Sequence, residues 1–373
     1  MLKNHLLKLK RLFSLVFQKL SKKQFLHLVQ AHKISKKNMK PDEGFITITD
    51  NVAKIKQLLM ELVLLPRIKA LEWSSITRQT PNMNIGYPGQ HLASLITGVE
   101  GCRTGARGDD LIDGTEAKSC SRVDQLDTCK NKKCKKKILR VEKICPHCGS
   151  LEIKRMDDSK WLFSIKSEAE LHLLTKGLDR IFLTLADYPN FAENDFSTLR
   201  FQAFELWNNT ERHNNFTYLM TNYYNKIFLE HISRNASKTP APKNFWPYSY
   251  QFYLCNPVRV FECIVKDADT DPKIDITHFV DPKQDRSELK TEPMPTTLLT
   301  KDEKIHLLTN IHPEILIPQL TEGYTYQNLV DSVHTSKTKF IKILPYINEQ
   351  TRSVLDLRDT DKVSVAKTAY IRR

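Results

Sequence analysis

The sequence contains no apolar run long enough to cross a bilayer, which disfavours an integral membrane protein with helical spans. The apolar run from Leu12 to Phe17 is short, and no small-residue cleavage site follows it, so a secretory signal peptide is not expected. We therefore expect a soluble, cytoplasmic protein without a membrane span. In such a compartment the eight cysteines stay reduced, so they are available to bind a metal.

Acidic residues are scarce in two parts of the chain. Residues 1–41 contain eleven Lys or Arg and no acid, and residues 129–143 contain eight against Glu142 alone. The phosphate backbone of nucleic acid is the natural partner of such positive segments. The stretch from Leu2 to Val29 mixes Leu, Phe and Lys at helical spacing, within a predicted basic N-terminal segment 1–50. It tracks DNA phosphates, lies on an anionic membrane surface, or packs on the rest of the protein; packing is the default.

Residues 109–118 combine two acids, a tight-turn dipeptide and an acid-x-lysine step. Asp113-Gly114 is a hairpin-turn signal, and Glu116 and Lys118 project from the same face if they lie on one strand. A carboxylate from each side of the turn would then share a divalent cation beside an ammonium. Acid-x-lysine also recurs at 152–154, 158–160 and 288–290, but those copies lack an Asp-Gly turn with a paired acid before it.

A cysteine pattern follows the predicted hairpin. Cys129-x4-Cys134 and Cys145-x2-Cys148 form two closely spaced pairs, and Gly149 supports a tight turn after the second pair. Four thiolates with this spacing close a tetrahedral zinc site, which predicts a zinc ribbon inserted at residues 126–152. Because a four-thiolate site has no open coordination position, the Zn²⁺ is expected to be structural.

The run from Gly86 to Gly98, residues 108–125 and the ribbon together resemble the MamI family of type II restriction endonucleases. The resemblance covers roughly residues 80–165. It implies a PD-(D/E)xK nuclease: an α/β fold with a mixed sheet flanked by helices, which uses Mg²⁺ to cut both strands of duplex DNA at a specific site. Gly108 stands before the acidic pair where the motif's name has a proline, a position without chemistry.

Transferred to this sequence, the motif makes Glu116 the second metal-binding acid and Lys118 the lysine, while the first acid is Asp109 or Asp110. A two-residue turn at 113–114 places Asp109 on the face of Glu116, and a three-residue loop at 113–115 places Asp110 there. We favour Asp110 because the apolar Leu111 follows it directly. Lys118 would orient or deprotonate the attacking water, or stabilise the charged transition state. Gln90 and His91, at the start of a predicted helix, either reach this site or form an exposed helix start.

The remaining sequence predicts further elements. A helix is expected from Val52 to Leu65, ending at Pro66, within a nuclease core that spans residues 51–264. After the ribbon we predict a strand at 160–165, helices at 168–185 and 196–235, and a polar, Pro-containing loop or linker at 265–300.

A C-terminal domain is predicted at residues 301–373. Within it, Leu329 to Leu344 resembles a helix-turn-helix, and an ordinary helical hairpin is the alternative. In the first case Lys337, Lys339 and Lys342 face the major groove and the segment from Ser353 to Tyr370 supplies a β-wing, as in a winged helix.

The sequence is therefore interpreted as a homodimeric, Mg²⁺-dependent restriction endonuclease with a structural zinc, which acts on double-stranded DNA in restriction-modification defence. The dimer is inferred from the need to cut two strands at a two-fold symmetric site. Two alternatives stay open: a repair or structure-selective nuclease with the same hairpin, and a non-catalytic zinc-ribbon protein that binds DNA.

Overall fold

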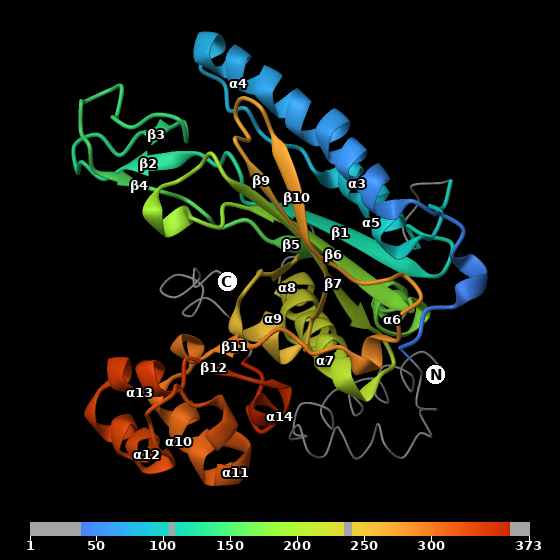
Figure 1. Ribbon diagram of the computed structural model, residues 1–373, viewed down its shortest axis with the longest axis vertical. Helices are drawn as coiled ribbons and strands as arrows, with labels where there is room; N and C mark the ends of the chain where they lie inside the picture. Colours follow the sequence, from blue (N-terminus) through green and yellow to red (C-terminus); the bar gives the residue numbers. More distant parts are fainter. Residues whose placement is uncertain (1–38, 104–108, 235–240, 359–373) are drawn as a thin grey trace. The chain divides into compact units, whose positions relative to one another are not determined.

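The computed structural model describes residues 39–103, 109–234 and 241–358, and its centre is a five-stranded mixed sheet (Figure 1). The strand order is β1-β6-β7-β9-β10, so β1 and β10 are the edges. Strands β1 and β6 run parallel, and the other neighbours are antiparallel. The bounds are β1 Thr115–Ser121, β6 Arg180–Asp187, β7 Leu199–Trp207, β9 Val258–Lys266 and β10 Lys273–Phe279. This architecture confirms the expected α/β class with a mixed sheet.

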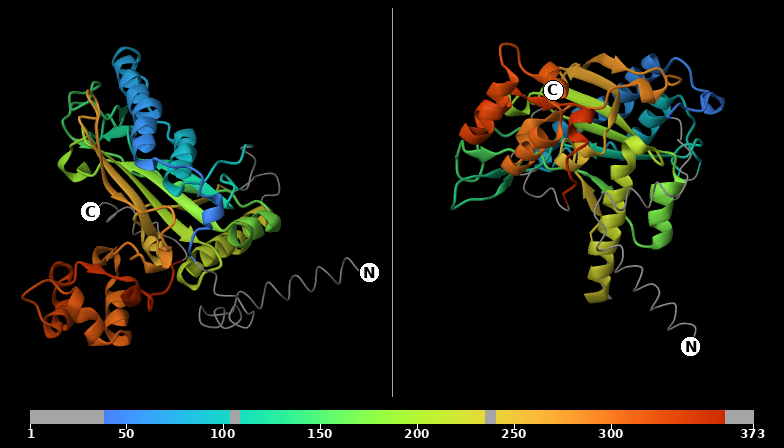
Figure 2. Two further views of the ribbon diagram at one scale, coloured as in Figure 1. Left: turned by 45° about the vertical axis from the view of Figure 1, so that its right-hand side comes forward. Right: turned by 90° about the horizontal axis from the view of Figure 1, so that it is seen from below.

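One face of the sheet is covered by the N-proximal helices. A continuous helical segment consists of α3 Asn51–Leu59, the π turn Met60–Leu64 and α4 Leu65–Thr77, which lie along one side of the sheet (Figure 2). Helix α5, Gly86–Thr97, packs on β1. The predicted helix at 52–65 is confirmed, but Pro66 does not end it, because the π turn directly before it shifts the hydrogen-bond register at the residue that has no N–H to donate.

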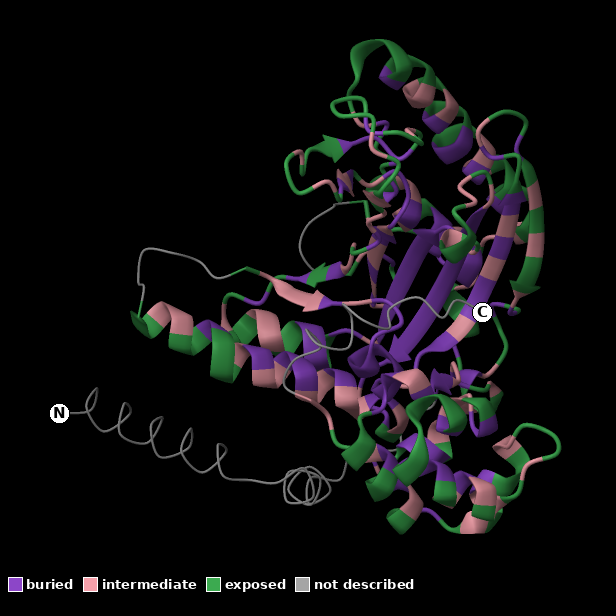
Figure 3. Cartoon of the chain, turned by 90° about the vertical axis from the view of Figure 1, so that its left-hand side faces the viewer, coloured by how far each residue is buried: buried purple, intermediate pink, exposed green. Residues whose placement is uncertain are grey.

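The opposite face carries an aromatic-rich core. Strand β5, Trp161–Phe163, confirms the predicted strand there, although it pairs with β8, Lys243–Phe245, outside the central sheet. Helices α7, Asn214–Tyr223, and α9, Tyr250–Leu254, add buried aromatic side chains to the same cluster. Figure 3 shows the central strands in the colour of buried residues. Edge strand β1 therefore belongs to a sheet that is packed on both faces.

The ribbon follows β1 directly. Its three short strands, β2 Asp127–Cys129, β3 Lys137–Ile138 and β4 Ile153–Lys154, pair in the order β3-β2-β4. The carboxylate of Asp127 is buried and accepts hydrogen bonds from Arg155 Nη1 at 2.6 Å and from the N–H of Met156 at 2.7 Å. The guanidinium of Arg140 lies among the rings of Tyr188, Phe191 and Phe196, at 4.8 to 5.6 Å from their centroids. The ribbon is thus fixed to the body of the protein.

Three sequence-based element predictions were wrong in part. The helix predicted at 168–185 consists of α6 Glu168–His172 and the π turn Leu173–Gly177, after which the chain enters β6. The helix predicted at 196–235 begins as strand β7 and becomes helical only from α7 onward. The loop predicted at 265–300 includes β10 and the end of β9. Burial of both sheet faces removes the alternating pattern from β6 and β7, which makes them resemble helices in sequence.

The C-terminal region of the described chain is helical, with α10 Lys301–Asn310, α11 Pro313–Leu316, α12 Tyr326–Thr335, α13 Lys337–Ile343 and α14 Glu349–Arg352. Helices α12 and α13 confirm the predicted pair, and their inner face buries Leu329, Val333, Phe340 and Ile343. Ser336 alone separates them, in place of the three to four residues of a helix-turn-helix, and its side chain forms no cap hydrogen bond. Residues 353–358 contain no strand, and the rest of the expected β-wing lies outside the described residues.

The predicted basic segment falls mainly on residues 1–38, which lie outside the described residues. Among the helices that the structure describes, none combines the length and the apolar character required to cross a membrane.

Candidate metal and nuclease site

The acidic turn lies immediately before edge strand β1. Leu111 forms isolated bridges with Thr115 on one side and Gly101 on the other, so residues 112–114 make a three-residue turn. Gly114 has a φ of +81°, which suits glycine, and the side chain of Asp113 accepts the N–H of Thr115 at 3.2 Å. The turn therefore lies one residue earlier than the three-residue loop expected at 113–115. With Leu111 opposite Thr115, residue 110 comes opposite residue 116.

A buried arginine fixes this turn to the sheet. Arg180 opens β6 and donates to Asp113 Oδ2 at 2.6 Å, to Thr115 Oγ1 at 2.9 Å and to Glu205 Oε1 at 3.0 Å. Burial opposes ionisation of Glu205, but the guanidiniums of Arg286 and Arg180 outweigh it and lower the pKa of that carboxyl. The turn is therefore tied to a charged network in the core. Sequence reasoning missed Arg180, because nothing local to it marks a partner 65 residues earlier.

The carboxylate of Asp110 lies at the free edge of β1. One oxygen accepts the backbone N–H of Ala117 at 2.8 Å, and the other accepts Gln90 Nε2 at 2.8 Å. Gln90 thus reaches the acid cluster, one of the two possibilities raised by the sequence. His91 is exposed and packs its ring against Tyr87 at 4.6 Å, which matches the other possibility. Asp109 is exposed.

Glu116 and Lys118 extend from β1 on one face and contact each other through Lys118 Nζ and Glu116 Oε1. The side chain of Glu116 is 13% exposed and that of Lys118 is 31% exposed, so a ligand can reach both. The strand prediction for these residues is confirmed. The structure thus brings Glu116 and Lys118 into contact and places Asp110 close to both.

Electrostatics disfavour charge on both acids. Burial raises the pKa of Asp110, and the neighbouring Asp109 adds to this effect, against the hydrogen bond from Ala117 and the charge of Lys118. Burial also raises the pKa of Glu116, and Asp110 and Asp109 reinforce the shift while Lys118 opposes it. The ammonium of Lys118 alone therefore does not neutralise the negative charge of the neighbouring carboxylates. A carboxylate pair short of positive charge is a suitable donor set for a hard divalent cation.

Helix α5 approaches β1 closely beside this cluster. A Cβ added to Gly89 would lie 1.9 Å from Ser119 Oγ and 2.9 Å from Ser119 Cβ, so glycine is required for this contact. The next residue of the helix is Gln90, whose amide binds Asp110. Because Gly89 lets α5 lie this close to β1, the side chain of Gln90 reaches the acid cluster.

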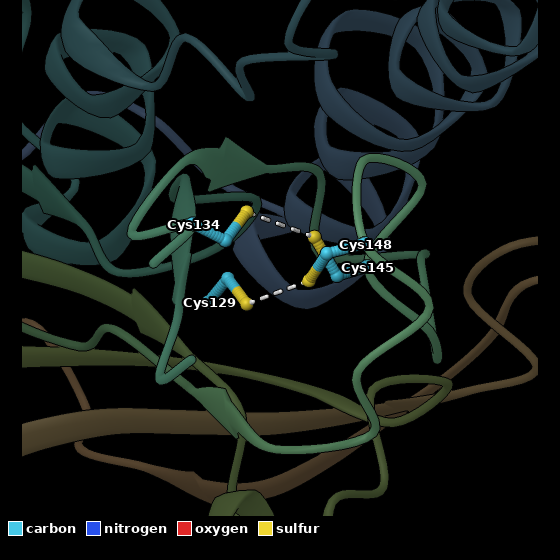
Figure 4. Close-up of side chains that lie close together, drawn as sticks. All are labelled: Cys129, Cys134, Cys145 and Cys148. Carbon is cyan, nitrogen blue, oxygen red and sulfur yellow. Dashed lines mark hydrogen bonds between the residues drawn. The ribbon is translucent and has the colours of Figure 1, made fainter. Parts of the chain in front are cut away.

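The four ribbon cysteines come together in space. Their sulfur atoms all lie within 4.8 Å of one another, with 3.6 Å between Cys129 and Cys148 and 3.7 Å between Cys134 and Cys145 (Figure 4). Zinc–sulfur bonds of about 2.3 Å in a tetrahedron place the sulfurs about 3.8 Å apart, so the arrangement fits one zinc ion. Burial favours the neutral thiol of Cys145, but hydrogen bonds from the N–H groups of His147 and Cys148 outweigh it and lower its pKa to about 7.

Comparison with known proteins defines the class of this chain. A family model described as MamI restriction endonuclease matches residues 72–297, which include the acid cluster, the ribbon and the central sheet. The chain therefore belongs to the MamI restriction endonuclease family.

A curated relative is the type II restriction enzyme MamI of Microbacterium ammoniaphilum. It is 30% identical to the chain over 84 residues, which cover 22% of the chain and 27% of the relative. The chain thus matches about a quarter of that protein's length. No solved structure matches the chain.

Proposed function

We propose that this protein is a type II, site-specific deoxyribonuclease that hydrolyses both strands of DNA with Mg²⁺ in restriction-modification defence. The observation that carries the proposal is the gathering of Asp110, Glu116 and Lys118 at the free edge of β1. The raised pKa values of both acids support a cation as the missing partner of this cluster. Family membership supports duplex DNA as the substrate.

In this proposal Asp110 and Glu116 hold the metal through their carboxylate oxygens. When bound, Mg²⁺ neutralises charge on the phosphoryl oxygens and lowers the pKa of a coordinated water. Gln90 keeps the carboxylate of Asp110 oriented through its 2.8 Å hydrogen bond. Lys118, next to Glu116, donates to the attacking water or to the phosphoryl oxygen, where negative charge increases during the reaction. Asp109 is exposed, so the geometry supports Asp110 as the first acid.

The ribbon holds a structural Zn²⁺ through Cys129, Cys134, Cys145 and Cys148. The sulfur separations support this assignment, and four thiolates leave no coordination position for a substrate. The zinc supports the fold of an insertion whose own apolar core contains only a few residues. The predicted division into segment 1–50, core 51–264 and C-terminal domain 301–373 stays a prediction, although β10 extends the sheet beyond residue 264.

The decisive experiment is digestion of phage and plasmid DNA with the purified protein, followed by mapping of the fragment ends. We expect Mg²⁺-dependent double-strand cuts at one sequence, and loss of more than about 100-fold in rate for Glu116→Gln, because that carboxylate holds the metal. Glu288→Gln is the matched control, since Glu288 is an exposed acid of another acid-x-lysine step and should keep wild-type activity.

Each alternative function gives a different result. Cuts at random positions or at junctions would identify a repair or structure-selective nuclease. Binding of DNA without cleavage, equal in wild type and Glu116→Gln, would identify a non-catalytic DNA-binding protein.

A further inference from the structure

The loop between β2 and β3, together with Lys137 at the start of β3, concentrates positive charge in a short segment of the ribbon. Six lysines in residues 130–137 are exposed: Lys130, Lys132, Lys133, Lys135, Lys136 and Lys137. Among the residues that the structure describes, none of the six forms an ion pair. Lys137 donates to Thr128 Oγ1 at 2.9 Å, and this neutral contact leaves its charge uncompensated. The loop thus presents a field that an anionic partner would neutralise.

The loop is carried on a fixed support. Cys129 precedes it and Cys134 lies within it, so the sulfur cluster closes its base. Asp127, buried at the start of β2, binds Arg155, and Arg140 is enclosed by aromatic rings of the β6–β7 connection. These contacts fix the backbone that carries the lysines relative to the sheet. The six lysines can therefore bind together to a ligand whose negative charges repeat at a regular distance.

The ribbon and the acid cluster lie toward opposite ends of β1. The chain passes from Glu116 to Ser121 along the strand and reaches β2 six residues later, and Figure 1 shows β2, β3 and β4 beyond that end of the sheet. Five residues of strand span about 17 Å. Duplex DNA rises about 3.4 Å per base pair, so a duplex that runs along β1 with a phosphate at Glu116 would meet the ribbon about five base pairs or more from that phosphate.

We infer that the lysine loop of the ribbon binds backbone phosphates of the substrate duplex outside the cleavage site, on the flank about five or more base pairs from the cut. This inference rests on the proposed function, because it takes the duplex at the acid cluster as its reference point. A lysine ammonium is a point charge that recognises phosphate without reading bases. The loop therefore contributes affinity and orientation for DNA of any flanking sequence.

The test compares binding of two duplexes that contain the mapped target, one that ends at the edge of the target and one with about 15 flanking base pairs on each side. In the wild type we expect tighter binding of the long duplex. In the variant Lys132→Gln, Lys133→Gln, Lys135→Gln, Lys136→Gln that preference should disappear, and the salt slope on the long duplex should fall by about 3 to 4, since each lost phosphate contact contributes about 0.9.

The control variant carries the same charge change at exposed lysines elsewhere: Lys56, Lys69, Lys273 and Lys283. It should retain the preference for the long duplex. Equal zinc content in all three proteins shows that the ribbon has folded. Retention of the full preference by the ribbon variant would overturn the inference. Lack of cleavage by the wild type would instead refute the proposed function. Because lysines that bind phosphates read no bases, the same comparison on a short and a long duplex of arbitrary sequence would then still test DNA binding by the lysine loop.

Discussion

Glu116 connects the proposed chemistry to stability. Its pKa is raised above the ordinary 4.5, so the folded protein without metal binds this proton more tightly than the unfolded chain does. Stability then decreases as the pH rises from about 4.5 through the raised value, because the unfolded state releases the proton first. Above that window the folded state carries a charge that its surroundings disfavour. The pKa of Asp110 is also raised, so its titration likewise lowers the stability of the folded protein as the pH rises.

We therefore expect Glu116→Gln to raise the thermal midpoint of the metal-free protein above the titration window and to leave it unchanged at lower pH. Divalent metal should reverse the order, because only the wild type keeps both ligands. Binding at ten times the dissociation constant stabilises by about 1.4 kcal/mol. Calorimetric melts between pH 4 and 8, in buffer without added divalent metal or with Ca²⁺, measure both effects while the ribbon keeps its zinc. A variant less stable than wild type at neutral pH without added metal would contradict the electrostatic account.

The choice between Asp109 and Asp110 shows the limit of sequence reasoning at this scale. The residue types and the shared face of Glu116 and Lys118 follow from spacing on a strand. The position of the first acid depends on the length of the turn, which the bridge between Leu111 and Thr115 determines. That bridge is supported by Arg180 and Glu205, which are distant in sequence. Contacts between residues so far apart in the sequence leave no local sequence pattern from which the length of the turn could be predicted.

At the scale of elements, the ribbon offers a test of metal binding. Its apolar core contains Cys129, Ile138 and Cys145, so little hydrophobic burial supports it without metal. Chelation of zinc, or Cys129→Ser, should make residues 126–154 sensitive to protease while the sheet core stays resistant. Mass spectrometry of the fragments locates the cuts. Cys102→Ser, a substitution outside the cluster, is the control and should behave as wild type. A ribbon that resists protease after zinc removal would show that the sulfur cluster is dispensable for its fold.

Some helices and strands could be predicted from the sequence and others could not. The ribbon was predictable because four cysteines at fixed spacing carry the information locally. Strands β6 and β7 were not, since every one of their residues is buried and the alternation typical of a strand is missing. Strand β10 does alternate, with Ile274 and Ile276 half-buried, but the polar residues around it suggested a loop. The sheet order itself depends on pairings between distant segments.

At the scale of the whole molecule, the described part of one chain carries one proposed nuclease cluster, formed by Asp110, Glu116 and Lys118, and a duplex has two strands to cut. We propose a homodimer whose two sites are related by a two-fold axis, as the symmetry of a palindromic target favours. Each subunit then cuts one strand.

Mixed dimers test this arrangement. Wild type combined with excess Glu116→Gln should produce nicked circular plasmid, because one subunit of each mixed dimer is inactive. Wild type combined with Glu288→Gln should produce linear DNA. Gel electrophoresis separates the two products. Linear product alone in the first mixture, in proportion to the wild-type fraction, would mean that one chain makes both cuts.

The hydrogen bond between Asp110 and the N–H of Ala117 has a second consequence, which concerns the border of the sheet. Among the residues that the structure describes, the outer side of β1 is paired only at Thr115, by its bridge to Leu111, and an open strand border is a template for self-association into aggregates. The carboxylate of Asp110 occupies one donor on that border and so protects the protein while serving its proposed chemistry. A chemist who wishes to remove the metal ligand without losing solubility should therefore choose Asp110→Asn, whose amide oxygen still accepts the Ala117 proton, over Asp110→Ala.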